Sequence, residues 1–415
     1  MKKYLILFIV TLFSTVLMAQ AVNKGQFYIK PGSTVSILYS FENKEEGDFR
    51  NNGVLYLYDN LISNGKFFDF KGNVPQGKTI FRGKKLQTIS GNSLIHLNNL
   101  ELDNSKQQKA FDLFAPIAIQ GNTQFNNGIL FVNPIGGSIS FMNNATTETT
   151  NDKSHIEGQM EKEGNKNFQF PQGDGGFYRP AQIFGAPKTK DVVVSEYTFK
   201  DDAFFKSHIN KSGVIVSIDT NEYWKVEQNT KATSSFVLTL SWDERTTSKA
   251  ILEANPKDIR IVRWDAKAQL WVDEGGVVDE SMKTVTTPTE LKGYGFFTLG
   301  LVKSDTLLEG DVVIYNYVNV NGADQNDFFR IDNITRFPNN KVEIFNRWGV
   351  KVYETTNYNS QGNVFRGYSE GRVTINKNEK LPSGTYYYIL TYEHTSKNGA
   401  NLIKKAGYIH LDSNE

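Results

Sequence analysis

Residues 52–58 read Asn-Gly-Val-Leu-Tyr-Leu-Tyr, residues 64–70 read Asn-Gly-Lys-Phe-Phe-Asp-Phe, and residues 127–133 read Asn-Gly-Ile-Leu-Phe-Val-Asn. Each run is a short apolar or alternating stretch that begins at Asn-Gly, and these two residues tolerate the left-handed backbone of tight corners. Imperfect repetition of such runs is typical of coils stacked in a parallel β-solenoid. We therefore predict a solenoid-like domain at residues 20–150, with inward aliphatic and Phe side chains and stacked corner asparagines. A sandwich of short hairpins stays open as the alternative.

The rest of the chain predicts two more β units, and the fold class is all-β. Residues 165–180, NKNFQFPQGDGGFYRP, are rich in turn-forming Gly and Pro, so we place a junction at 151–189. Residues 190–300 contain strand-like runs and four tryptophans, which favours a β-sandwich with Trp core anchors. A sugar-stacking role for these tryptophans is the alternative. A linker at 301–310 leads to an immunoglobulin-like sandwich at 311–415.

The N-terminus predicts export. Lys2 and Lys3 precede an apolar stretch at 5–17, which is shorter than the roughly 20 residues needed to span a bilayer. Residues 1–19 are therefore expected to be a Sec signal peptide, cut near Ala19 or Ala21. No later stretch is long and apolar enough to span a membrane directly.

Composition narrows the function further. The chain has no cysteine, so a lipid anchor, disulfides, thiol nucleophiles and Cys-ligated metals are excluded. The formal net charge is +1 for the whole chain and −1 without the two leader lysines, so we expect no nucleic-acid partner.

Three short motifs stand in order near the C-terminus. They are Phe345-Asn346-Arg347-Trp348-Gly349, Leu381-Pro382-Ser383-Gly384-Thr385-Tyr386 and Gly407-Tyr408. The first predicts a tight hairpin whose Gly supplies a positive φ. Together these motifs closely resemble the gliding-motility-associated C-terminal domain, the type B sorting domain of type IX secretion in Bacteroidetes, over residues 311–415.

The resemblance implies a route and a partner. The protein would cross the inner membrane by Sec and the outer membrane through the type IX translocon, and would be secreted to the cell surface. Family members often work with an outer-membrane barrel of the PorP/SprF family, so outer-membrane association is expected. Five basic residues give this domain either a docking surface or ordinary edge-strand protection: Lys341, Arg347, Lys351, Lys404 and Lys405.

Upstream segments show a less specific resemblance. Phe81-Arg-Gly83, the stretch 168–174 (FQFPQGD) and Tyr223-Trp224 are similar to solenoid-like segments of large Bacteroidetes surface proteins. This similarity supports the predicted architecture and implies no ligand.

A calcium site is the one cofactor that the sequence suggests. The family often has an Asn-Gly-Asp-Gly-x-Asn-Asp loop, whereas residues 321–327 here read Asn-Gly-Ala-Asp-Gln-Asn-Asp. Oxygen ligands from Asn319, Asn321, Asp324 and Asp327 would suit Ca²⁺. The alternative is a turn held by hydrogen bonds of its own side chains.

Motifs for catalysis are missing from the sequence. The five histidines, at positions 96, 155, 208, 394 and 410, do not have metal-ligand spacing, and neither a zinc-protease nor a nucleophile-elbow motif occurs. Asp69, Glu101 and Asp103 lie on expected solenoid strands, and the last two share one face. They are either solvated or the carboxylates of a small polysaccharide-acting enzyme.

The leading hypothesis is a noncatalytic surface protein. Its β domains would serve adhesion, display or assembly of the gliding or secretion apparatus, and its terminal domain would carry transport and docking.

Overall fold

The computed structural model describes residues 20–68, 77–106, 108–184, 190–212, 215–229, 236–291, 293–302, 312–320, 327–369, 380–396 and 399–413, with the backbone alone at 394–396 and 399–402. The predicted leader, residues 303–310 of the predicted linker, Asp69, Asn321 and Asp324 lie outside this set. The chain is 55% strand and 5% helix, which confirms the all-β prediction. No helix in the described ranges has the length and apolar character needed to cross a membrane.

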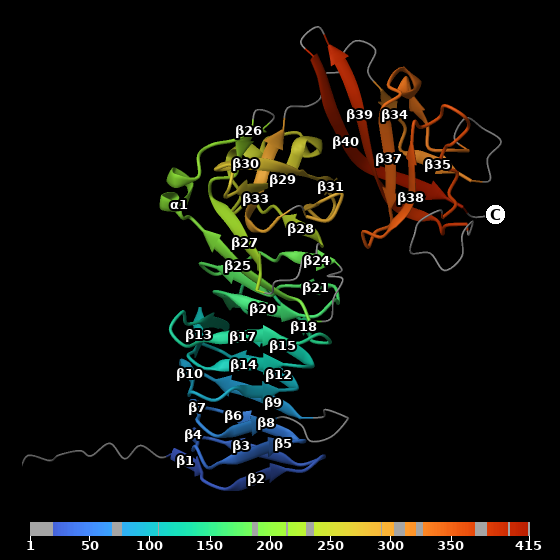
Figure 1. Cartoon of the computed structure of the whole chain (residues 1–415). Helices are drawn as coiled ribbons and strands as arrows, with labels where there is room; N and C mark the ends of the chain where they lie inside the picture. The colour runs from blue at the N-terminus through green and yellow to red at the C-terminus, as the bar shows by residue number, and fades with distance from the viewer. Residues whose placement is uncertain are drawn as a thin grey trace, which may run out of the picture.

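The N-terminal part is a parallel solenoid of about six turns, which confirms that prediction over the hairpin alternative. Each turn contributes one strand to each of three sheets, and Figure 1 shows the turns stacked from β1 upward. The first sheet contains β1 (Gln20–Asn23), β4 (Ser40–Asn43), β7 (Leu61–Ser63), β10 (Gln87–Ser90), β13 (Lys109–Leu113), β16 (Ile129–Val132), β19 (Ile156–Glu157) and β22 (Gln172–Asp174). The second contains β2 (Gln26–Ile29), β5 (Asp48–Asn51), β8 (Lys66–Phe68), β11 (Ile95–Leu97), β14 (Pro116–Ile119), β17 (Ser138–Phe141) and β20 (Met160–Glu163). The third contains β3 (Thr34–Ile37), β6 (Val54–Leu57), β9 (Lys78–Gly83), β12 (Asn99–Asn104), β15 (Asn122–Asn127) and β18 (Thr146–Glu148).

Side chains at equivalent positions of successive coils stack on one another and form the solenoid interior. Successive side chains of a strand point to opposite faces, so every second residue is buried; in β6, Leu55 and Leu57 are buried and Val54 and Tyr56 are partly exposed. Phe49 and Phe67 stack in adjacent coils with ring centroids 4.6 Å apart. The Nδ2 of Asn23 donates to the Oδ1 of buried Asn43 at 2.8 Å, so the asparagines that end β1 and β4 stack across adjacent coils, and Ser63 has the same position in β7.

The solenoid and the middle sandwich are joined by one continuous sheet. In the second sheet, the last parallel strand, β20, pairs antiparallel with β25 (Val192–Phe199). From there the sheet continues through β27 (Glu222–Gln228), β33 (Gly295–Val302), β29 (Ile259–Asp265) and β30 (Leu270–Gly275), with β26 (Ile215–Ile218) beside β33. The facing sheet contains β21 (Phe168–Gln169), β24 (Gln182–Phe184), β28 (Val237–Ser241), β32 (Thr284–Thr286) and β31 (Val277–Asp279). One hydrophobic core runs through both parts, from Ile29 to Leu299, so they form one body, and a smaller cluster that contains Trp264 and Trp271 lies within the sandwich.

Short elements complete this body. They are β23 (Phe177–Tyr178), α1 (Asp202–Ser207), α2 (Lys249–Leu252) and a 3₁₀ turn at Pro256–Asp258. The segment 151–189, predicted as a junction, contains β19 to β24 and so supplies the last solenoid strands and the first strands of the facing sheet. Trp224 and Trp271 are completely buried and Trp264 is 5% exposed. These three rings are core anchors and present no face for stacking on a sugar.

The C-terminal domain has a core of its own. Its main sheet has the order β35 (Tyr317–Asn319), β40 (Gly399–Asp412), β39 (Gly384–Ser396), β37 (Asn340–Phe345) and β38 (Lys351–Thr356). A small sheet pairs β34 (Val313–Ile314) with β36 (Ile331–Asp332), and a 3₁₀ turn follows at Ile334–Arg336. Phe329, Tyr358, Phe365 and Tyr392 are fully buried between them. This domain lies beside the sandwich, away from the β1 end of the solenoid (Figure 1).

Candidate functional site

The turn between β37 and β38 presents two motif side chains at the surface. The Oδ1 of Asn346 accepts hydrogen bonds from the backbone N–H groups of Trp348 and Val350, both at 3.0 Å. Gly349 has φ +74°, as predicted for the hairpin. Trp348 is consequently 50% exposed, and the Arg347 guanidinium carbon lies 4.2 Å from its ring centroid. This cation–π pair can bind an apolar or anionic partner surface.

The same turn also touches the sandwich. A Cβ atom built on Gly349 would lie 2.8 Å from Cγ2 of Val237 in β28. Phe345, at the end of β37, is 9% exposed. The hairpin is therefore anchored on one side by the neighbouring domain while Arg347 and Trp348 form its open tip.

The second motif forms the start of β39. The chain bends at Ser383, between Pro382 and Gly384, and the Tyr386 hydroxyl donates to the Pro382 carbonyl at 2.9 Å. Tyr386 is 5% exposed, so it fixes this bend rather than offering a binding face. Burial raises the pKa of its hydroxyl.

The third motif places a glycine beneath a tyrosine ring. Tyr388 of β39 lies opposite Gly407 of β40, and a Cβ atom on Gly407 would meet the Tyr388 hydroxyl oxygen at 2.7 Å. The ring therefore crosses β40 where only hydrogen occupies the side-chain position. Burial raises the pKa of Tyr388, and the next residue of the motif, Tyr408, is 44% exposed.

Most of the basic residues predicted for docking are engaged with other residues. Lys341 binds Glu343 at 3.0 Å and Glu354 at 2.8 Å, and Lys351 binds Glu343 at 3.1 Å and also pairs with Glu354. Hydrogen bonds from the two lysines lower the pKa of Glu354 to about 2. This cluster is a balanced ionic ladder on β37 and β38, which suits edge protection better than a cationic docking surface. Lys404 and Lys405 line a cavity against the sandwich.

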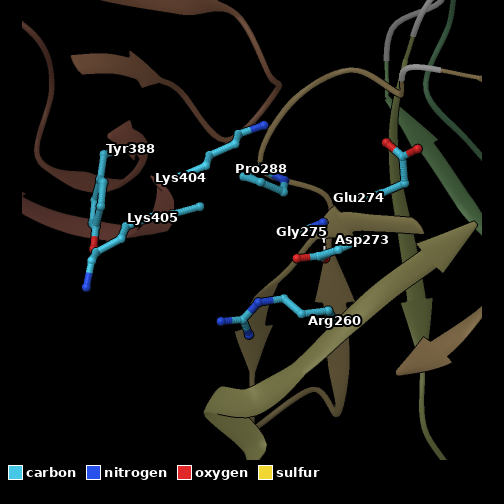
Figure 2. A pocket seen from close by; sticks show the side chains of 9 residues that line it. Arg260, Asp273, Glu274, Gly275, Pro288, Tyr388, Lys404 and Lys405 are labelled. Carbon is cyan, nitrogen blue, oxygen red and sulfur yellow. Dashed lines mark hydrogen bonds between the residues drawn. The ribbon is translucent and has the colours of Figure 1, made fainter. Parts of the chain in front are cut away.

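Two adjoining cavities separate the C-terminal domain from the sandwich. The larger has a volume of about 760 Å³, and its walls include residues 276–280 on one side and 406–408 on the other. The smaller, of about 230 Å³, has Tyr388, Lys404 and Lys405 on one side and Arg260, Asp273, Gly275 and Pro288 on the other (Figure 2). Sequence reasoning missed this cleft because its walls come from distant segments.

The proposed calcium ligands are only partly described. Asn319 lies on β35 in register with Asp412, and Asp327 forms an ion pair with Arg366. Asn321 and Asp324 lie outside the described residues, so calcium binding remains a prediction. Elsewhere in the described ranges, no group of three or more Asp, Glu or His side chains is arranged to hold a metal ion.

The solenoid carboxylates are held by counter-ions and amides. Glu101 pairs with Lys78 and accepts a hydrogen bond from Asn126 at 3.0 Å. Asp103 binds Arg82 at 2.8 Å and accepts from Asn127 at 3.0 Å. They are therefore members of a ladder of cations, carboxylates and amides on the third solenoid sheet. Asp69 lies outside the described residues.

The four histidines with described side chains form no cluster that could hold a metal ion. His96 stacks on Phe68 with centroids 4.9 Å apart, and burial lowers its pKa. His155 is buried with Nδ1 3.0 Å from the Asn151 carbonyl oxygen. The side chain of His394 is outside the described set.

A buried ion pair between the junction and the sandwich was missed from the sequence. The Glu222 carboxylate accepts from Arg179 Nε at 3.0 Å and Nη2 at 2.9 Å, and from the Tyr197 hydroxyl at 2.7 Å. Glu222 is fully buried and Arg179 is 2% exposed. Arg179 also donates to Ser241, and its carbonyl accepts from Trp224 Nε1 at 3.1 Å. A signal existed, because Glu222 directly precedes the Tyr223-Trp224 pair and Arg179 lies in the same Gly- and Pro-rich segment as FQFPQGD.

A second carboxylate lies next to this pair. Burial, together with the charge of Glu222, raises the pKa of Asp219 to about 7. Asp219 accepts hydrogen bonds from the backbone N–H groups of Asn221 and Ser248. The network of Arg179, Glu222 and Asp219 holds the segment 151–189 to the sandwich. None of these three residues lines either of the cavities described above.

Comparison with known proteins gives one match. No curated protein and no solved structure matches the chain significantly. Residues 312–411 match the family model of the CHU_C type IX secretion signal domain. This match confirms the predicted terminal sorting domain, and it supports export by type IX secretion to the cell surface. The C-terminal domain of this chain therefore belongs with the type IX secretion signal domains.

Proposed function

We propose that the protein is a noncatalytic cell-surface component that docks to an outer-membrane partner through its C-terminal domain and displays the solenoid and sandwich for adhesion or assembly. Export by Sec and the type IX translocon brings it there, and a PorP/SprF-family barrel is the proposed partner. The observation that carries the docking role is the exposed tip of the β37–β38 hairpin. Arg347 and the half-exposed Trp348 project from a turn that Asn346 fixes, and such anchored aromatic and arginine side chains dominate protein–protein contacts.

The display role follows from the shape of the rest of the chain. The solenoid and sandwich share one sheet and one core, so they project from the signal domain as a single rigid element. Glu101 and Asp103, the carboxylates best placed for chemistry on the solenoid, are each tied to a cation and an amide. This supports a noncatalytic role over a polysaccharide-acting enzyme.

The experiment compares three tagged forms in the native host: the full chain, a chain that ends at residue 302, and the R347A/W348A double variant. Secretion and outer-membrane fractionation report export, and gentle co-purification followed by mass spectrometry reports docking. The truncated form should stay in the periplasm. The double variant should be exported but lose an outer-membrane barrel that the full chain retains at an equal ratio.

Two results would contradict the proposal. Normal export of the truncated form would remove the sorting role from residues 312–411. Recovery of the full chain alone in the medium would remove the lasting docking role. A control substitution, Tyr317→Ala, removes an exposed aromatic side chain elsewhere on the same domain and should leave both readouts unchanged.

A further inference from the structure

The first coil of the solenoid, residues 20–39, ends the stack without a described cap. β1, β2 and β3 are edge strands of the three sheets, and no described strand lies on their open side. Fifteen of these twenty residues are exposed, against three of the twenty residues 40–59 in the next coil. At the other end of the solenoid, β20 pairs with β25 and the core continues into the sandwich. Solenoids normally close their ends with a polar capping repeat, so an open end of this kind indicates a surface that a partner covers.

The hydrophobic core is only half covered at this end. Phe27 stacks on Phe49 with ring centroids 5.3 Å apart, and Phe49 stacks on Phe67 in the following coil. Phe49 and Phe67 are completely buried, whereas Phe27 is 38% exposed. The third sheet shows the same difference: both inward residues of β3 are partly exposed, although Leu55 and Leu57, their neighbours in β6, are fully buried. The stack therefore ends on apolar side chains whose outer faces are open to water.

The three strands also direct backbone groups to the open side. In β3, the Ile37 carbonyl accepts from the N–H of Tyr58 in the second coil at 3.0 Å, so the backbone groups of Ile37 face β6. Backbone direction alternates along a strand, so Ser36 directs its N–H and C=O away from β6, to the open edge. The same alternation, applied to the bonds of the second coil with β1, β2 and β3, gives this direction to a further set of residues: Gln20, Val22, Gln26, Tyr28 and Thr34.

These edges lack the usual protection against pairing. Proteins guard an exposed sheet edge with charged side chains or proline on the edge strand. The twelve residues of β1, β2 and β3 include neither kind. The two charged side chains of the first coil, Lys24 and Lys30, lie in the turns between the strands, where their long stems can keep the ammonium groups in water. By contrast, the edge strand β38 of the C-terminal domain carries Lys351 and Glu354.

The form of this end defines what can cover it. A free strand of a partner would pair with one edge and leave the other two edges and the core open. An occupant that covers everything at once must present three strand edges around an open apolar core. In the described part of the chain one surface has this form, and it is the same end of a second copy. With residues 20–39, the coil also has about the size of one side of a standard protein interface, which contains roughly 20–30 residues.

The two ends of the solenoid decide how copies can be arranged. Because β25 continues the far end, the first coil of one copy cannot stack on the last coil of another. Two copies must therefore meet with their first coils, related by a twofold axis perpendicular to the solenoid axis. This arrangement makes the contacting strands antiparallel and closes the contact at two copies. The strands β1, β2 and β3 each contain four residues, so any of these edges matches any other in length.

We propose that the protein forms a head-to-head dimer in which the first coils of two copies stack, with their open edges paired as antiparallel strands and their apolar cores joined. This inference goes beyond the proposed docking role and does not depend on it. The first coil lies at the end of the molecule away from the signal domain (Figure 1). Two displayed molecules can therefore pair at their tips while their C-terminal domains remain docked, which would make the contact between them homophilic.

The test uses the purified chain from Gln20 to Glu415, without an N-terminal tag, in analytical ultracentrifugation from nanomolar to millimolar concentration. The mass should double as concentration rises and then stay constant. Ser36→Pro removes an open-edge N–H and keeps the bonds to β6, a place where an edge strand tolerates proline. It should weaken dimerisation by about tenfold or more, because the twofold axis makes the loss occur in both copies. Ser36→Thr keeps this N–H and should dimerise like the unchanged protein.

Amide hydrogen exchange on the unchanged protein makes the result independent of any folding defect in the proline variant. Exchange at Tyr28 and Ser36 should be fast in dilute protein and slow at the concentration of the dimer, whereas Val216, an exposed residue of β26, should not change. Three results would each overturn the inference: a monomer at every concentration, which would leave this end to a different partner; a dimer that Ser36→Pro does not weaken; or growth into oligomers larger than two copies.

Discussion

The change Glu222→Gln tests how the solenoid is held to the sandwich. Glutamine keeps the shape of the side chain but leaves the Arg179 guanidinium buried without its counter-charge. Removing one partner of a buried ion pair costs about 3–5 kcal/mol. For a body of this size, a shift of roughly 2–4 °C in melting temperature accompanies each kcal/mol. The expected fall in melting temperature is therefore about 10 °C.

Urea and thermal unfolding, followed by tryptophan fluorescence, measure this change directly. Trp224 is a suitable reporter because its indole N–H donates to the Arg179 carbonyl. The R179M/E222Q double variant should recover part of the loss, since neither charge is then left alone in the core. Glu244→Gln breaks an exposed pair with Lys283 and should have no measurable effect.

The shared sheet adds a second expectation, which circular dichroism measures in the same unfolding series because the solenoid contains no tryptophan. Because one core runs through solenoid and sandwich, both should unfold in a single transition in the unchanged protein and in the Glu222→Gln variant. A destabilisation below 1 kcal/mol would refute the role assigned to the buried pair. A separate, unshifted solenoid transition would refute the single body.

Three further changes have defined outcomes. Asn43→Ala breaks the bond from Asn23 and should cost about 1–3 kcal/mol in urea unfolding; no loss would show that the Asn23–Asn43 pair is not stabilising. Asp219 has a raised pKa of about 7 in the folded state, so its carboxyl group takes up a proton more readily there than when unfolded, and stability should fall as pH rises from about 4 to 7. Asp219→Asn should therefore become progressively more stable than the unchanged protein across that range, and melting curves at pH 4, 5.5 and 7 that shift in parallel would contradict this. Gly407→Val pushes a side chain into Tyr388 and should destabilise the C-terminal domain by about 1–3 kcal/mol, whereas an unchanged melting temperature would show that the ring moves aside freely.

Local features of the sequence predicted the solenoid and the hairpin. Asn-Gly corners and alternating runs set the coils because the preferences of one or two residues suffice to turn the chain. The hairpin followed from Gly349 in the same way, and its φ of +74° agrees with the prediction.

Local sequence patterns could not predict which residues far apart in the chain pair with each other. Nothing in residues 160–163 or 192–195 marks them as the place where a parallel ladder becomes antiparallel, because hydrophobic alternation is the same in both. The Arg179–Glu222 pair joins positions 43 residues apart, and burial of a charge depends on what packs around it. The strand-lined cleft likewise depends on the placement of two domains, which no local pattern encodes.

The antiparallel step from β20 to β25 has a mechanical consequence. A solenoid joined by a flexible tether would swing freely, and force applied at its far end would be lost in the tether. Here the load passes from coil to coil and into β25 through backbone hydrogen bonds of a single sheet. The solenoid and the sandwich together therefore act as a lever. A push on the first coil turns the sandwich with it and delivers torque to the boundary with the signal domain.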